Sequence, residues 1–151
     1  MEDPQKRVLI VEDDQLLALV ENRLVSKLGY DVVGEASSGH EAIRMTSELN
    51  PDILLMDISL NGEMDGIEAV EEIRKNSSVA VIYLSGNSDK FNYERAKKTG
   101  FISYLVKPVT QEDLKEPLLK AAFRGKESQF TPAPEFNREK NTRRRLVNQL
   151  G

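Results

Sequence analysis

Acidic side chains that follow short apolar runs are the residues best suited to chemistry. Glu12 and Asp13 come directly after the apolar run 8–11, and Asp57 comes directly after the apolar run 53–56. Carboxylates held together in a partly desolvated cleft raise the pKa of at least one of them, unless a cation balances their charge. Such a cluster of oxygen ligands suits Mg²⁺, which prefers octahedral oxygen coordination and keeps several waters.

A serine and a lysine also come directly after such runs, further along the chain. Ser85 ends the apolar run 79–84, and Lys107 follows the run 102–106. A carboxylate beside Mg²⁺, a lysine and a hydroxyl is equipped for phosphoryl transfer, in which the protein mainly positions groups and neutralises charge on the phosphoryl oxygens. Asp57 would be the nucleophile in such a reaction.

These residues need a scaffold that brings the ends of the apolar runs to one edge. The expected strands are residues 8–11, 30–36, 53–56, 79–84 and 102–106, and the expected helices lie between Asp14 and Gly29 and over residues 38–49, 66–74, 88–99 and 111–123. Because parallel strands need right-handed crossovers, this alternation predicts an α/β fold with a doubly wound, five-stranded parallel sheet, (βα)5. Sites in such sheets form at the carboxyl ends of the strands.

The first expected helix begins after another acidic residue. Asp14 is expected to be its N-cap, and a third metal ligand is the alternative. Apolar residues that repeat at helical spacing predict the apolar face of this helix: Leu16, Leu17, Val20, Leu24 and Leu28.

Length and composition exclude several classes of protein. The 151 residues suffice for one ordinary domain. The chain has no cysteine and a single histidine, His40, which excludes disulfides, thiol catalysis and any multi-histidine metal centre. We expect His40 at the surface. The first residues are charged, and no apolar run approaches the roughly 18 residues that cross a bilayer, so we expect a cytoplasmic protein with no membrane partner.

Charge is distributed unevenly along the chain. The formal net charge is −4, from 21 basic and 25 acidic residues, which is no signature of a nucleic-acid partner. From Arg124 onward the net charge is +4, and residues 1–123 carry −8. An acidic body is therefore followed by a basic end.

The basic end is too short for a second domain. Residues 125–137 have the composition of a linker, and residues 138–150 could form one or two helical turns. The latter segment contains three arginines followed by three aliphatic residues, at 143–145 and then Leu146, Val147 and Leu150. The predicted organisation is a folded domain over 1–124 and a basic tail or linker without its own core over 125–151.

On these residues the sequence resembles the receiver domain of two-component response regulators, the CheY-like family. The resemblance covers about residues 6–123 and rests on residues that occur in the family's order: Glu12-Asp13, Asp57, Ser85, Tyr104 and Lys107-Pro108. It implies a flavodoxin-like strand order, 2-1-3-4-5, and a phosphoacceptor switch of a phosphorelay rather than an enzyme. Asp57 would take a phosphoryl group from a histidine kinase or phosphotransfer protein in a Mg²⁺-dependent step. Phosphorylation from small phosphodonors and self-dephosphorylation are also expected.

The resemblance also implies a metal site. Asp13 and Asp57 would bind Mg²⁺ directly, together with the backbone carbonyl of Ser59, and Glu12 would act mostly through bound water. Ser59 and Asn87, each two residues beyond a key position, would tune the rate of dephosphorylation.

The phosphoryl group would have its own contacts. Lys107 and the Ser85 hydroxyl would each bind a phosphoryl oxygen, and Gly86 would leave room beside the acyl phosphate. The Lys107-Pro108 peptide bond is expected to be cis, as is common at this place in the family.

The same resemblance implies how the switch is transmitted. Movement of Ser85 toward the phosphoryl group would vacate space that Tyr104 fills by turning inward. The surface of the fourth helix, fifth strand and fifth helix would then change for a downstream protein partner, and phosphorylation-linked dimerisation stays an open alternative. Plain core packing is the alternative for Tyr104.

One stretch departs from the family pattern, and other functions stay open. The loop over residues 58–66 lacks the usual proline and is one residue longer, so we expect a more mobile loop. The chain could instead be the regulatory front module of a longer sensor kinase or output protein, or a docking module that works without phosphorylation. A phosphate-ester hydrolase is the third alternative, but Ser59 stands where such enzymes carry a second aspartate.

Overall fold

The computed structural model describes residues 5–86 and 90–126 of the chain. The strands are β1 (Arg7–Val11), β2 (Asp31–Ala36), β3 (Ile53–Asp57), β4 (Ala80–Ser85) and β5 (Ser103–Val106). The helices are α1 (Gln15–Lys27), α2 (Gly39–Leu49), α3 (Gly66–Ile73), α4 (Lys90–Lys97) and α5 (Gln111–Lys126). The strands form one parallel sheet in the order β2-β1-β3-β4-β5, which confirms the predicted fold and strand order.

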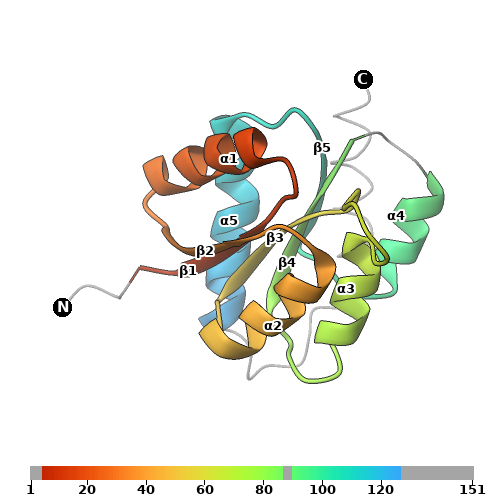
Figure 1. Ribbon diagram of the computed structural model, residues 1–151. Helices are drawn as coiled ribbons and strands as arrows, with labels where there is room; N and C mark the ends of the chain where they lie inside the picture. The colour runs from red at the N-terminus through yellow and green to blue at the C-terminus, as the bar shows by residue number, and fades with distance from the viewer. Residues whose placement is uncertain (1–4, 87–89, 127–151) are drawn as a thin grey trace.

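Helices cover both faces of the sheet. Figure 1 shows α1 and α5 on one face and α2, α3 and α4 on the other. Successive strand residues point to opposite faces, so the apolar strands feed two cores. In β1, for example, Leu9 and Val11 pack toward α2, α3 and α4, whereas Val8 and Ile10 pack toward α1 and α5.

Acidic side chains cap the starts of α1 and α3, and only the cap of α1 was predicted. The Asp14 carboxylate accepts hydrogen bonds from the backbone N–H groups of Leu16 and Leu17 at 2.9 and 3.1 Å, which confirms Asp14 as the N-cap of α1. Asp65 caps α3 in a reciprocal capping box with Glu68. The two caps fix where α1 begins after β1 and where α3 begins after β3.

The predicted apolar face of α1 is wrong in part. Leu16 and Val20 are 69% and 45% exposed, and the helix instead buries Ala18, Glu21 and Val25. Periodicity identifies side chains that share a face of a helix, but it does not say which face meets the sheet. Because the centre of the buried face is the acidic Glu21, the true face did not look apolar.

Other element boundaries differ by a few residues. α5 continues to Lys126, past the predicted end at Phe123, and it contains Pro117. The predicted helix 88–99 begins among residues that are not described, and its described part is α4. Among the described residues, no helix has both the length and the apolar character to cross a bilayer.

Candidate functional site

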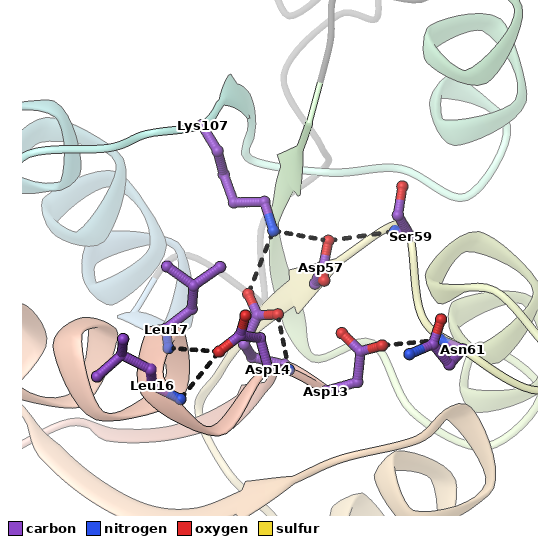
Figure 2. A network of polar contacts seen from close by, with 9 residues as sticks. Asp13, Asp14, Leu16, Leu17, Asp57, Ser59, Asn61 and Lys107 are labelled. Atoms are coloured by element: carbon purple, nitrogen blue, oxygen red, sulfur yellow. Dashed lines mark hydrogen bonds and ion pairs between the residues drawn. The ribbon is translucent and has the colours of Figure 1, made fainter.

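Acidic side chains meet at the carboxyl edge of the sheet. Glu12 and Asp13 directly follow β1, and Asp57 is the last residue of the neighbouring β3. Carboxylate oxygens of the three residues lie within 4.8 Å of one another. Figure 2 shows Asp13 and Asp57 facing the same space. This all-oxygen set fits a hard, octahedral cation such as Mg²⁺.

Lys107 bridges two of these carboxylates. Its Nζ lies 3.3 Å from Glu12 Oε1. It also lies 3.3 Å from Asp57 Oδ1 (Figure 2). Burial lowers the pKa of Lys107, but the charges of Asp57 and Glu12 outweigh burial, so its pKa lies above the ordinary value. The ammonium group therefore stays charged and neutralises part of the cluster.

Burial also governs the pKa of Asp57. Burial and the negative charge of Glu12 raise the pKa of Asp57 to about 6, although Lys107 and the backbone N–H of Ser59 act in the opposite direction. The Ser59 N–H donates to Asp57 Oδ1 at 3.1 Å. In the absence of a metal ion, Asp57 would thus titrate close to neutrality.

Glu21 is a site residue that sequence reasoning missed. It comes from the buried face of α1 and is 3% exposed. Burial, together with a hydrogen bond to Glu12 and the charge of Glu12, raises the pKa of Glu21 to about 9. Burial alone would raise the pKa of Glu12, but hydrogen bonds from Glu21 and from the Asp14 N–H lower it below its ordinary value. The signal available in the sequence was an acid amid leucines and valines at helical spacing.

The β3–α3 loop closes over the acidic cluster. The backbone N–H of Asn61 donates to Asp13 Oδ2 at 3.0 Å (Figure 2), and the Gly66 N–H donates to the Ile58 carbonyl at 2.9 Å. A Cβ on Gly66 would collide with the carbonyl oxygen of Asp57, so only glycine permits this approach of α3 to β3. The greater mobility expected for this loop stays a prediction.

The two predicted switch residues lie on neighbouring strands: Ser85 is the last residue of β4, and Tyr104 lies in β5. Ser85 is 2% exposed, and its carbonyl accepts the Lys107 N–H at 2.7 Å. Tyr104 is 1% exposed, and its ring packs edge-on against Tyr93 with 5.2 Å between centroids. Tyr83 is fully buried in the core.

The remaining predicted residues are placed as follows. The Lys107-Pro108 peptide bond is cis, and Gly86 has open space where a side chain would extend. His40 is exposed, as expected. Asn87 lies outside the described residues.

Comparison with known proteins identifies the family. The response regulator receiver domain family matches residues 8–119. The chemotaxis protein CheY of Thermotoga maritima is 37% identical over 118 residues, which are 78% of this chain and 98% of that protein. The transcriptional regulatory protein PdtaR of Mycobacterium tuberculosis is 36% identical over 109 residues, which are 72% of this chain and 53% of that protein. The chain thus spans about half the length of some curated relatives.

Solved structures agree with this match. The signal receiver domain of a modulated diguanylate cyclase from Desulfovibrio desulfuricans has a TM-score of 0.77 and 34% identity, covering 83% of this chain and 100% of that one. A CheY-like receiver domain protein from Methanospirillum hungatei has a TM-score of 0.74 and 28% identity. The match covers 82% of this chain and 99% of that one. With the carboxylates and the lysine gathered at one edge of a 2-1-3-4-5 sheet, the chain belongs to the CheY-like receiver domain family of two-component response regulators.

Proposed function

We propose that the chain is a phosphoacceptor switch in which Asp57 accepts a phosphoryl group from a phosphohistidine on a histidine kinase or phosphotransfer protein. A carboxylate oxygen of Asp57 attacks phosphorus, the phosphorus–nitrogen bond breaks, and the histidine nitrogen leaves and takes a proton from solvent. The observation that carries this proposal is the position of Asp57, buried at the sheet edge with Lys107 at 3.3 Å and two further carboxylates beside it.

The acidic cluster would hold a Mg²⁺ ion. Asp13 and Asp57 would be direct ligands with the Ser59 carbonyl, and Glu12 would act through water. The bound ion would neutralise charge on the phosphoryl oxygens. Lys107, whose Nζ pairs with Asp57 at 3.3 Å, would transfer that contact to a phosphoryl oxygen.

The phosphorylated state would be transmitted through Ser85 and Tyr104. A phosphoryl group on Asp57 adds an acceptor for the Ser85 hydroxyl, and Gly86 leaves room beside it. Tyr104 is already buried against Tyr93 of α4, so a change at Ser85 would reach the α4-β5-α5 face through this contact. A downstream protein partner would bind that face. Ser59 and Asn87 would set the rate of dephosphorylation.

Mass spectrometry of the intact protein tests the chemistry. After incubation with acetyl phosphate and Mg²⁺, we expect a gain of about 80 Da, the mass of one phosphoryl group. Asp57→Asn and addition of EDTA should each abolish the gain. A gain that persists in Asp57→Asn, or no gain with any small phosphodonor, would overturn the proposal.

A second candidate function is regulation of a longer protein by this domain. The observation in its favour is that the matched region is only 53% of PdtaR, whereas it is 98% of CheY. The complete reading frame of the gene distinguishes the two alternatives, because a regulatory front module would be followed by a further encoded domain and a stand-alone switch would not. A docking module that needs no phosphorylation would instead bind its partner equally well with Asp57→Asn.

A further inference from the structure

One side of α1 exposes apolar side chains that the fold does not use. Leu16, Leu19 and Val20 are 69%, 48% and 45% exposed and share the side of the helix that faces away from the sheet. We call these three residues the α1 apolar strip. Exposed apolar side chains grouped on one face mark interaction sites more often than isolated ones do.

Acidic residues lie at the start of this strip. Asp14 is exposed and caps α1, and Asp13 is half-buried at the edge of the sheet. Along its axis, α1 therefore presents negative charge first and apolar surface second. The exposed apolar pair on α5, Leu119 and Phe123, is flanked in sequence by the basic residues Lys120 and Arg124, although acidic residues also lie in the first turn of α5. Basic neighbours of this kind disfavour a segment that begins with arginines.

The C-terminal segment of the chain has the complementary order. Residues 143–145 are arginines, and they are followed by Leu146, Val147 and Leu150. In a helix these aliphatic residues would share one face, as the strip residues do, because both sets repeat at spacings of three or four residues. The chain thus offers positive charge first and apolar surface second.

We propose that residues 143–150 dock along α1 of the same molecule, with the arginines beside Asp13 and Asp14 and the aliphatic residues on the α1 apolar strip. The inference concerns binding within the chain and does not depend on phosphorylation. It explains why apolar side chains are exposed directly beside the acidic site, and it would shield that side of the site from other proteins.

The length of the connection allows this contact. α1 and α5 lie on the same face of the sheet (Figure 1), and α1 is 13 residues, or about 20 Å, long. Residues 127–142 would span about 20–24 Å as a flexible chain. Such a tether produces an effective concentration in the millimolar range, so a contact with a Kd of about 1 mM would be roughly half occupied.

A spin label placed in the segment tests the proposal in the full-length chain. Because the sequence has no cysteine, Asn148→Cys accepts a nitroxide label at one position only. We expect strong paramagnetic broadening of the amide signals of residues 16–23 in the ¹⁵N-labelled protein, and none in α2, which lies on the other face of the sheet. Broadening centred on α5 or on any other surface, or no broadening at all, would overturn the proposal.

Matched variants identify the contact. Leu19→Ser should remove most of the broadening, whereas Leu119→Ser, at a residue that is 47% exposed, should leave it unchanged. Leu146→Ser, at a position outside the described residues, should have the same effect as Leu19→Ser. A mixture of spin-labelled ¹⁴N chains with ¹⁵N chains that carry no spin label reports contacts between two molecules only. If the same broadening of residues 16–23 appears in this mixture, a second copy occupies the strip and the proposal is wrong.

Discussion

At the carboxyl edge of the sheet, one lysine and two carboxylates lie close together and are largely buried. Lys107 is 18% exposed and lies 3.3 Å from both Glu12 and Asp57, whose side chains are almost fully buried. A buried carboxylate is costly unless it is paired, so the lysine and a bound cation serve the same purpose and compete electrostatically.

Replacing Lys107 should therefore separate metal binding from phosphorylation. We expect Lys107→Met to bind Mg²⁺ several-fold more tightly, because a positive charge beside the ligands is removed. Phosphorylation from acetyl phosphate should slow by about 10²–10³-fold, the usual loss when a group that stabilises the transition state is removed. Calorimetric titration with Mg²⁺ and the rate of mass gain measure the two effects. Weaker Mg²⁺ binding in Lys107→Met would contradict this account, and Lys107→Arg is the charge-preserving control.

Glu21 should make the stability of the metal-free protein depend on pH. Its pKa is about 9 in the fold and near 4.5 when unfolded, so between these values the folded state binds more protons. Stability from this group is therefore complete at low pH and is lost as pH rises toward 9, by at most about 1.4 kcal/mol per pH unit. Glu21→Gln removes this dependence.

Thermal unfolding in EDTA from pH 5 to 8 measures the effect of Glu21→Gln. The Tm of the variant should exceed that of the wild type by an amount that grows with pH. A difference that is constant across this range would show that Glu21 is ionised in both states.

At the scale of elements, Arg74 joins segments that are far apart in sequence. From the end of α3, its guanidinium donates to the carbonyls of Thr99 and Gly100 at 2.8 Å and of Val79 at 2.7 Å. These carbonyls belong to the turns before β4 and β5. Arg74 thus links α3 to the start of two strands on which the site depends.

Loss of Arg74 should destabilise the fold. Arg74→Met leaves three carbonyl groups without their charged donor, and we expect the free energy of unfolding to fall by about 2–4 kcal/mol. Arg44→Met is the matched control, because Arg44 forms an exposed pair with Glu48, its one partner within residues 5–86 and 90–126, and should contribute less than about 0.5 kcal/mol. Urea denaturation compares the two variants, and equal midpoints would refute the structural role of Arg74.

For the whole molecule, a metal ion at the acidic cluster should stabilise the fold. Glu12 and Asp13 follow β1 and Asp57 ends β3, so a shared ion would connect adjacent strands at the sheet edge. A ligand that binds only the folded state adds about 2.7 kcal/mol when its concentration is 100 times its Kd.

Neighbouring aspartates provide a test of this stabilisation. Asp13→Asn should abolish the increase in Tm that Mg²⁺ produces in the wild type. Asp14→Asn makes the same change of charge one residue away, but asparagine is an equally good N-cap, and its Mg²⁺ response should persist. If Asp14→Asn also loses the response, Asp14 is a metal ligand as well as a cap.

The sequence by itself determined the architecture and most of the candidate site. Apolar runs such as 53–56 alternate with helical periodicity, and a parallel sheet brings every strand's carboxyl end to one edge. Residues that follow those runs, such as Asp57 and Lys107, therefore had to lie near one another. This inference needed no side-chain detail, because the common direction of the strands alone determines at which edge of the sheet these residues lie.

Tertiary structure alone decided which side chains touch. Packing turned Glu21 of α1 inward onto Glu12 and left Leu16 exposed, which is the reverse of what apolar periodicity suggested. It also placed the Asn61 N–H on Asp13, 48 residues away in the chain. Such contacts depend on a few ångströms of helix rotation and loop path, and these are set by the combined packing of distant segments rather than by any local pattern.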